Sequence, residues 1–390
     1  MWKVMEIKRK GPTLHDFPYS GPGRKCYHKW IVNVTPPGRD HCLHSCLYCY
    51  ARDAVYSRSS KGIMEIYANI DEVVKRELDS LHLCPPVCIS NVTDPCQDVP
   101  ELKRAVSRLV RVLSSRGVSF HIITKGDPSF LEDVEGFPGR GMFFLELTVE
   151  GPPEVLRIIS PAAPPYQARM GAMGWAKRNG LRAILRLDPL IPPLYQAAYG
   201  DGWLEAAREV MAEAAKNGAG HVVCSTGRLS PAALARVVSA AENVIPGAGE
   251  RVRRYYRFER GPTCYGMMIP LPLRREIHAH LRDLAEGLGM TYGVCQELPP
   301  GEGDSPGLPH CEAYPMPFSR RLEDGSFAPL EGCTANCHVH CAGEEEPSCG
   351  LPELAKPEPY RPSLLRRRPG GRRTRLPLFD HEVGGKKITP

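Results

Sequence analysis

Three closely spaced cysteines are the residues of this sequence whose spacing most directly indicates chemistry. Cys42, Cys46 and Cys49 form a C-x3-C-x2-C pattern shortly after a run rich in β-branched residues. Three thiolates on one short loop can bind three irons of a 4Fe–4S cubane and leave the fourth iron open to a small chelating molecule. A structural zinc ion usually takes four protein ligands, so zinc would also need His41 or His44. The spacing therefore favours an iron–sulfur cluster over zinc.

A second group of cysteines lies near the end of the chain. Four of them follow a C-x3-C-x3-C-x7-C pattern, at Cys333, Cys337, Cys341 and Cys349, and Cys311 and three histidines are nearby. Four thiolates are sufficient for an auxiliary 4Fe–4S cluster. A mixture of cysteine and histidine is typical of a structural zinc site. We predict a second metal site here, which could hold either a 4Fe–4S cluster or a zinc ion.

The composition is that of an ordinary globular protein. Of the 390 residues, 42% are hydrophobic and 24% are charged. There is no run of 18 apolar residues, and the charged N-terminus lacks the hydrophobic stretch of a secretion signal. We therefore expect a cytoplasmic protein with no membrane partner. Fifteen cysteines in a reducing compartment indicate metal binding or redox chemistry more than disulfides.

Positive charge is concentrated at the C-terminus. Residues 361–390 contain nine basic side chains against two acidic ones, whereas the whole chain has a formal net charge of +6. Gly and Pro interrupt the arginine-rich part of this segment, which is typical of a flexible tail. Such arms bind nucleic-acid phosphates without reading sequence, so nucleic acid is a candidate partner. A solubilising terminus is the other interpretation.

Strand-like and helix-like segments alternate through the first 225 residues. Short apolar or β-branched runs predict strands at Lys29–Val34, Val87–Val92, Phe120–Thr124, Gly141–Val149, Leu181–Leu187 and His221–Ser225. Helices with amphipathic spacing lie between them, for example at Pro100–Ser115 and Trp203–Asn217. Six such units predict an α/β fold, a partial (β/α)6 TIM-type barrel. An open doubly wound sheet is the alternative.

Changes in composition divide the chain into five segments. We expect an N-terminal extension at residues 1–29, the partial barrel at 30–228 and a helical completion of the core at 229–300. A cysteine-rich extension with the second metal site follows at 301–355, and the basic tail occupies 356–390.

The first cysteine group and the motifs that follow it resemble the radical S-adenosylmethionine (SAM) superfamily, in particular its spore photoproduct lyase-like branch. The resemblance covers about residues 30–225, with a weaker match at Ile277–Glu297. Its motifs, in the family's order, are the cysteine triplet with Tyr48, Cys49–Arg52, Val92–Pro95 with Gln97, Thr124–Gly126, Arg157–Pro164 and Asp188–Pro192.

This resemblance implies the cofactors and the type of reaction. It implies a 4Fe–4S cluster on the three cysteines and electron transfer from it to SAM. The 5′-deoxyadenosyl radical that results would abstract a hydrogen atom from the substrate. The site should lie at the C-terminal ends of the barrel strands. A reductant such as ferredoxin or flavodoxin should supply the electron.

The resemblance also implies which residues lie around SAM. The end of the second strand should meet the methionine amino group, here through Asn91, Thr93 and Asp94. Lys125, at the end of the third strand, could reach the SAM carboxylate as a point charge. The alternative interpretations are an ordinary turn and a solvated lysine.

A carboxylate within an apolar strand is a further candidate. Glu146 lies in Phe143–Val149, where a buried carboxylate without a partner is costly. It could bind the ribose hydroxyls or the amino group of SAM. It could equally form a buried ion pair with Arg186 that braces the barrel interior.

The lyase that gives the branch its name uses a further cysteine as a hydrogen-atom donor near the turn after the second strand. Cys88 and Cys96 flank this turn, but neither is in the same register, and Asn91 lies closest to that position. We predict Cys88 to be a core thiol and take Cys96, expected to be exposed, as the candidate catalytic cysteine. The departure argues against spore photoproduct repair itself.

The sequence thus predicts a radical SAM enzyme, a lyase or a modifying enzyme, acting on DNA or RNA in repair or modification. A radical SAM enzyme that modifies a peptide or small metabolite is the second hypothesis. A metal-stabilised nucleic-acid-binding protein without catalysis is the third.

Overall fold

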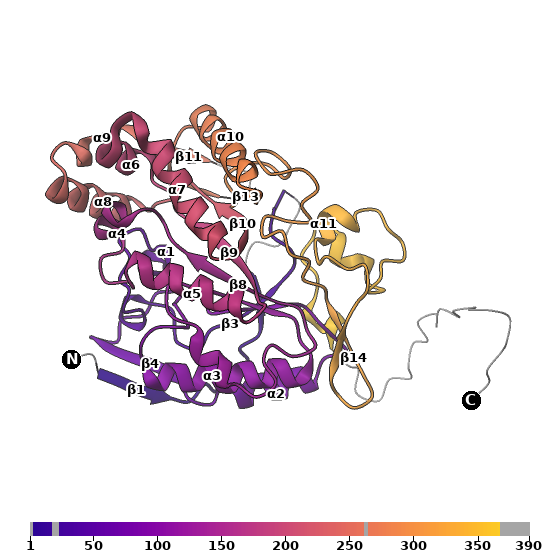
Figure 1. Ribbon diagram of the computed structural model, residues 1–390. Coiled ribbons are helices and arrows are strands. Elements are labelled where there is room, and N and C mark those ends of the chain that lie inside the picture. Colours follow the sequence, from indigo (N-terminus) through magenta and orange to yellow (C-terminus); the bar gives the residue numbers. More distant parts are fainter. Residues whose placement is uncertain (1–2, 18–22, 261–263, 367–390) are drawn as a thin grey trace.

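A sheet of eight strands forms the centre of the protein (Figure 1). The computed structural model describes residues 3–17, 23–260 and 264–366. The short strand β2 (His15–Asp16) lies at one edge and pairs antiparallel with β3. The other seven strands are parallel: β3 (Trp30–Val32), β6 (Val87–Ile89), β7 (Phe120–Thr124), β8 (Phe143–Thr148), β9 (Arg182–Leu187), β10 (Ala219–Cys224) and β13 (Thr291–Val294).

The strand order decides between the two predicted architectures. A doubly wound sheet reverses its direction at a switch point. Here each parallel strand from β3 to β13 pairs with the next parallel strand along the chain, without a reversal. This is the winding of a (β/α) barrel. Among the described strands β2 does not pair with β13, so the barrel is open, and the predicted partial barrel is confirmed.

Helices connect the parallel strands, and Figure 1 shows α5 (Tyr166–Arg178) and α7 (Trp203–Lys216) lying along the sheet. Helix α3 (Pro100–Arg116) shows how the sequence specifies such an element. It begins with proline, buries one apolar face and ends at Gly117, whose φ of 69° suits a left-handed cap. The other longer helices are α2 (Ile70–Asp79), α4 (Pro153–Ile159), α6 (Pro192–Tyr199), α8 (Pro231–Val244), α9 (Ala248–Tyr255) and α10 (Leu271–Gly287).

The region after residue 229 contains more strand than the sequence predicted. A hairpin of β11 (Arg257–Arg260) and β12 (Tyr265–Met268) lies there, and β13 adds a seventh parallel strand beside β10. The prediction missed β13 because it is only four residues long and contains a glycine, which weakens a strand pattern. Gly293 is needed for packing, because a Cβ there would overlap the carbonyl oxygen of Cys311.

Backbone pairing joins the cysteine-rich extension to the barrel. In it, β14 (Ser319–Arg321) pairs antiparallel with β15 (Phe327–Pro329) and with β5 (Leu83–Cys84). The N-terminal lead-in runs along the same extension. The N–H of Cys311 donates to the carbonyl of Lys25 at 3.1 Å. Segments near the two ends of the chain therefore lie side by side.

Within the described residues, no helix combines the length and apolar composition needed to cross a membrane. The predicted basic tail begins at residue 356, and its part from residue 367 onward lies outside the described residues.

Candidate active site

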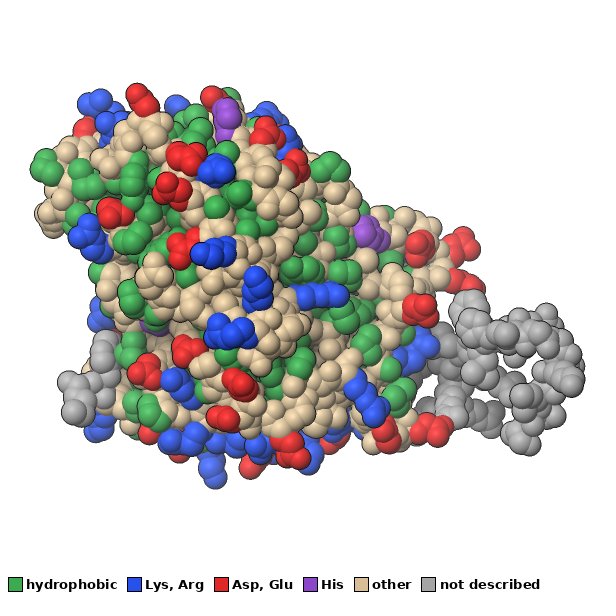
Figure 2. Space-filling view, in the orientation of Figure 1, with side chains coloured by type: hydrophobic (Ala, Val, Ile, Leu, Met, Phe, Trp, Pro, Cys, Tyr) green, Lys and Arg blue, Asp and Glu red, His purple; other side chains and the backbone are tan. Residues whose placement is uncertain are grey.

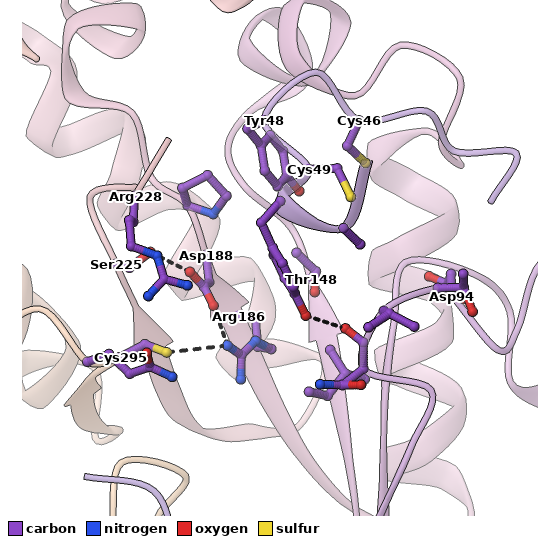
Figure 3. A pocket seen from close by; sticks show the side chains of 18 of the residues that line it. Cys46, Tyr48, Cys49, Asp94, Thr148, Arg186, Asp188, Ser225, Arg228 and Cys295 are labelled. Atoms are coloured by element: carbon purple, nitrogen blue, oxygen red, sulfur yellow. Dashed lines mark hydrogen bonds and ion pairs between the residues drawn. The ribbon is translucent and has the colours of Figure 1, made fainter. Parts of the chain in front are cut away.

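A cavity of about 400 Å³ lies at the carboxyl ends of the parallel strands (Figure 3). Residues that end or directly follow β6 to β10 line it, among them Asn91, Lys125, Thr148, Arg186 and Ser225. Barrel enzymes place their sites at this end because the loops after the strands converge there. This is the end of the barrel at which the sequence analysis expects the site.

The first cysteine group forms one end of this cavity. Cys42, Cys46 and Cys49 all line it, on the loop between a 3-10 turn (Arg39–His41) and α1 (Tyr50–Asp53). Figure 3 shows Cys46 and Cys49 close together on this loop. The arrangement presents three sulfur ligands to one end of the cavity.

Two side chains fix the cysteine loop to the barrel. Gln97 accepts a hydrogen bond from the N–H of Leu43 at 2.6 Å and donates one to the carbonyl of His41 at 3.2 Å. Asp94 contacts Nδ1 of His44 at 3.3 Å. Burial acts to raise the pKa of Asp94, but His44 and the hydrogen bonds that Asp94 accepts hold this pKa well below its usual range. Asp94 therefore stays ionised and anchors the loop.

The thiols of this loop need a positive partner in order to ionise. Burial raises the pKa of Cys42 to about 12 and the pKa of Cys46 to about 11. A bound metal cluster would supply the missing positive charge. The zinc interpretation required His41 or His44 as a further ligand, but both histidines are engaged by other protein groups.

Five of the six residues predicted around SAM line the cavity: Asn91, Thr93, Asp94, Lys125 and Arg186. Among the described atoms, Oδ1 of Asn91 is buried and has no hydrogen-bond partner, so it is an acceptor available to a ligand. Asp94 is already engaged, since it accepts from the Thr124 hydroxyl and from the N–H of Lys125, both at 2.6 Å. Asn91 thus has a free acceptor at the cavity, whereas the carboxylate of Asp94 is used within the protein.

Lys125 is a cation of the cavity that lies beside the cysteine loop. Its Nζ lies 3.7 Å from a carboxylate oxygen of Glu150 and 5.6 Å from the ring centroid of Tyr48. Burial acts to lower the pKa of Lys125, but the negative charges of Cys46 and Glu150 outweigh it and raise this pKa to about 12. Glu150 is itself held by the Tyr48 hydroxyl and by Arg169. Sequence reasoning missed Glu150, although it directly follows a buried strand.

Glu146 does not line the cavity, and the structure places it in the ion pair with Arg186. Its carboxylate is fully buried and also contacts Nδ1 of His121 at 2.7 Å. Arg186 reaches the cavity, where it pairs with Asp188 and lies 3.8 Å from Sγ of Cys295 (Figure 3). The predicted contact of Glu146 with SAM is therefore replaced by a bracing role.

The expectation that Cys96 is exposed was wrong. Its side chain is only 1% exposed and does not line the cavity. Its backbone packs so closely against Gly126 that a Cβ at that glycine would overlap the carbonyl oxygen of Cys96. Burial raises the pKa of Cys96 well above its usual value. Cys88 is 1% exposed, as expected for a core thiol, and it also lines the cavity.

Three residues at the end of the cavity away from the cysteine loop were not among the predicted site residues: Asp188, Ser225 and Arg228. Asp188 accepts a hydrogen bond from the Ser225 hydroxyl, and Arg228 lies beside them (Figure 3). Asp188 belongs to a motif of the family resemblance, which was the available signal. Arg228 follows β10 without any pattern that would have marked it.

The floor of the cavity combines thiols with buried charges. Cys26, Lys29 and Glu312 line it, and Lys29 pairs with Glu312 at 2.7 Å. Sγ of Cys26 lies 3.8 Å from Sγ of Cys311. The hydrogen bond with Cys311 lowers the pKa of Cys26 to about 6, helped by the charges of Arg24 and Lys29 against the effect of burial.

The second cysteine group is also assembled by the fold. Burial and then the charges of the other three thiols raise the pKa of Cys337, which begins the short helix α11 (Cys337–His340). The nearby histidines have other contacts: His310 with Tyr27, His338 with His28, and His340 with Thr334. Ring contacts do not occupy the imidazole nitrogens, and Nε2 of His310 and Nδ1 of His338 have no hydrogen-bond partner among the described atoms. Both a four-thiol and a mixed cysteine–histidine ligand set therefore stay open.

Both cysteine groups are more widely spaced than a site for one ion. Among the described residues, the sets of three or more potential ligand atoms within 4.8 Å of one another are Cys26–Cys311–Glu312 and His121–Glu146–Glu312. Neither the triplet nor the quartet is among these sets. A zinc ion with Zn–S bonds of about 2.3 Å holds its sulfurs about 3.8 Å apart. Neither group thus holds three ligand atoms at the spacing of a single ion, among the described residues.

Comparison with known proteins includes a match along nearly the whole chain. A radical SAM Nα-GlyT isomerase of Pseudomonas phage M6 is 22% identical over 396 residues, covering 94% of this chain and 76% of that protein. Spore photoproduct lyase complexed with dinucleoside spore photoproduct superposes with a TM-score of 0.54 and 14% identity. The superposition covers 76% of this chain and 82% of the lyase. No family model matches.

The chain is a radical SAM enzyme. The similarity to the phage isomerase and the shared fold with spore photoproduct lyase confirm the predicted resemblance. An uncharacterized protein of Methanocaldococcus jannaschii is also similar, with 23% identity over 204 residues, covering 50% of this chain and 71% of that protein. Radical SAM enzymes use SAM and a 4Fe–4S cluster and need an electron donor. The hypothesis of a binding protein without catalysis is set aside.

The network behind the cysteine loop predicts a large effect of Arg169→Met on stability. The substitution leaves Glu150, fully buried, without its closest cation. Breaking a buried pair in this way costs about 3–5 kcal/mol. Arg208→Met removes an exposed pair with Glu205 and should cost about 0–1 kcal/mol. Denaturant unfolding of the two variants measures the difference, and equal losses would contradict this interpretation.

Proposed function

We propose that this radical SAM enzyme binds its 4Fe–4S cluster through Cys42, Cys46 and Cys49 and modifies a nucleotide within a nucleic-acid strand. The observation that carries the choice of substrate is a set of exposed aromatic and arginine side chains at and beside the cavity. The cluster assignment rests on the three sulfurs at one end of that cavity.

The cysteine loop suits a cluster in three respects. Its thiols face one cavity, their burial calls for positive charge, and the histidines that zinc would require are engaged elsewhere. When bound, the cluster supplies the electron that cleaves SAM into methionine and a 5′-deoxyadenosyl radical. A ferredoxin or flavodoxin is the proposed electron donor.

The protein's own residues would hold SAM in place. Lys125 provides a fixed positive charge beside Cys46, which suits the carboxylate of methionine. Oδ1 of Asn91 provides a free acceptor, which suits the amino group. Arg186, braced by Glu146, fixes the cavity wall on the side away from the cysteine loop.

Aromatic side chains are exposed at and beside the cavity. Tyr50 and Tyr56 line it, yet they are 45% and 51% exposed. On the β11–β12 hairpin, Phe258 is 61% exposed and Tyr265 is 72% exposed. Exposed aromatic rings beside a cavity are groups on which the bases of a nucleic acid can stack.

The hairpin is attached to the cavity wall. Leu229, which lines the cavity, exchanges two backbone hydrogen bonds with Met267 of β12, at 3.0 and 2.9 Å. Exposed arginines at both ends of β11, Arg257 and Arg260, could contact phosphates. Elsewhere charges of both signs are interspersed on the face in Figure 2. The nucleic-acid contact that we propose is local, at the hairpin beside the cavity.

The compared proteins support the same substrate class. The lyase structure is a complex with a dinucleoside, and it shares most of the fold of this chain. The departure at the second-strand turn, where Asn91 lies closest to the position of the lyase's additional cysteine, argues against the lyase's own reaction. Modification of a nucleotide is therefore a better proposal than repair of spore photoproduct.

We further propose an auxiliary 4Fe–4S cluster on Cys333, Cys337, Cys341 and Cys349. Four thiols influence one another's pKa there, and their spacing exceeds that of a zinc site. Four thiolates are the usual ligand set for such a cluster.

Replacing one cysteine of the first loop should abolish SAM cleavage. In Cys42→Ser, Cys46→Ser or Cys49→Ser, iron content should fall and release of 5′-deoxyadenosine under reducing, anaerobic conditions should stop. Cys84→Ser, which alters a buried thiol away from the cavity, should retain both. Parental iron content and turnover in all three loop variants would overturn the cluster assignment.

Removing the hairpin aromatics should weaken nucleic-acid binding. The double substitution Phe258→Ala and Tyr265→Ala should cost about 1–3 kcal/mol for each base that stacks. Fluorescence anisotropy with a labelled single-stranded oligonucleotide, at fixed salt, measures the loss. Leu322→Ala, another exposed apolar side chain, is the control. Unchanged affinity would favour a peptide or small metabolite as the substrate.

The auxiliary cluster predicts the metal content of a Cys337→Ser variant. The parent should contain about eight irons and the variant about four. Elemental analysis of anaerobically reconstituted protein measures this difference. Loss of zinc with unchanged iron would instead identify a structural zinc site.

A further inference from the structure

Three side chains with metal-binding groups meet at the cavity floor, apart from both cysteine groups discussed above. They are Cys26 from the N-terminal lead-in, and Cys311 and Glu312 from the cysteine-rich extension. Their ligand atoms all lie within 4.8 Å of one another. The hydrogen bond from the Cys311 N–H to the Lys25 carbonyl, at 3.1 Å, holds the two segments together. Gly293 leaves room for the backbone of Cys311.

We propose that Cys26, Cys311 and Glu312 bind one divalent metal ion of the zinc type, with its fourth position open to the cavity. This site is independent of the proposed substrate. It differs in residues and spacing from the sites proposed for the two iron–sulfur clusters.

The spacing of the two sulfurs matches a single ion. Sγ of Cys26 and Sγ of Cys311 are 3.8 Å apart. Two thiolates bound to one tetrahedral zinc at about 2.3 Å are also about 3.8 Å apart. Neither Cys42–Cys49 nor Cys333–Cys349 contains three ligand atoms that all lie within 4.8 Å of one another, among the described residues. The floor site is therefore the one whose geometry suits a mononuclear ion.

Glu312 has an oxygen available for the ion. One oxygen, Oε1, accepts from Nζ of Lys29 at 2.7 Å. The other, Oε2, is buried and has no hydrogen-bond partner among the described atoms. A buried carboxylate oxygen without a partner is costly, and a metal ion would satisfy it. Lys29 would then orient the carboxylate, as second contacts of metal ligands commonly do.

The charges around the site can accommodate the ion. Two thiolates and a carboxylate carry three negative charges, so a divalent ion leaves one, which Lys29 balances. Arg186 is already compensated by Glu146 and Asp188. Arg24 is a third buried cation whose charge acts on Cys26 and Cys311, and burial lowers the pKa of its guanidinium.

The second compact set, His121–Glu146–Glu312, is explained without a metal. Both oxygens of Glu146 are engaged, one by His121 at 2.7 Å and the other by Arg186. Glu146 therefore has no unpaired carboxylate oxygen left to bind an ion. The free oxygen of Glu312 favours the set that contains the two cysteines.

The open coordination position gives this ion a role at the cavity. Cys26 and Glu312 both line the cavity, so a bound ion would form part of its floor. Three protein ligands and one open position are the arrangement of zinc sites that bind a substrate or water molecule. An oxygen or nitrogen donor atom of the substrate is the ligand class that would fill it.

Metal analysis of the full-length, anaerobically purified and reconstituted enzyme tests the proposal. After incubation with zinc and removal of free metal, the parent should retain one zinc per chain in addition to its iron. Cys26→Ser and Cys311→Ala should lose that zinc and keep the parental iron content. Cys264→Ser, which changes a cavity thiol outside the set, should keep both. Zinc lost only in Cys337→Ser would assign it to the second cysteine group and overturn the proposal.

A second measurement covers variants that fold poorly. Competition of the parent and of Glu312→Gln with a chromophoric zinc chelator should show affinity reduced by at least roughly 10-fold in the variant. Cobalt substitution of the parent should give a thiolate-to-cobalt charge-transfer band, absent in Cys26→Ser. Unchanged affinity in Glu312→Gln would overturn the site. So would a Cys26–Cys311 disulfide found by alkylation and mass spectrometry in protein purified under reducing conditions.

Discussion

Charge buried inside the barrel is the constraint on which the rest of the structure depends. A buried ion costs several kcal/mol unless a partner of opposite charge and hydrogen bonds compensate it. Here Glu146 pairs with Arg186 across β8 and β9, and Lys29 pairs with Glu312 of the extension. Because these pairs join segments far apart in the chain, the barrel interior is complete only when the lead-in and the extension are both in place.

The extension therefore packs against the barrel and helps to form its cavity. It contributes Glu312 to the cavity, and Cys311 packs where Gly293 leaves space beside β13. A barrel that remains open between β13 and β2 needs such a segment, since its interior would otherwise meet water. The short strand β13 and the extension thus together shield the open side of the barrel from water.

Local patterns carried most of what the sequence could predict. Six of the seven parallel strands were recognised because each is a short apolar run between helical segments. The cysteine triplet was recognised because its members lie within eight residues. The floor of the cavity could not be predicted in this way. Cys26 and Cys311 are separated by 285 positions, and no short motif marks either of them. The same holds for Glu150, whose partners Arg169 and Tyr48 come from other elements.

The errors in the prediction have a similar origin. Cys96 follows an Asp-Pro turn, which usually indicates exposure, but close packing against Gly126 buries it. From the sequence, Glu146 could either bind SAM or form a buried ion pair. Only the positions of His121 and Arg186 in the fold decided for the ion pair. Patterns along the chain therefore identified the side chains that can bind metal or react. Which partners these side chains contact depended on the tertiary fold.

The second cysteine group and the cavity are linked through the lead-in. The N–H of His28 donates to the carbonyl of Ala335 at 2.7 Å, and Ala335 lies between Cys333 and Cys337. Lys29, the next residue after His28, carries the charge that holds Glu312 at the floor. Metal binding that orders the loop from Cys333 to Cys337 would thus also fix the backbone next to Lys29. By this route a metal that takes no part in the reaction would still determine the shape of the cavity.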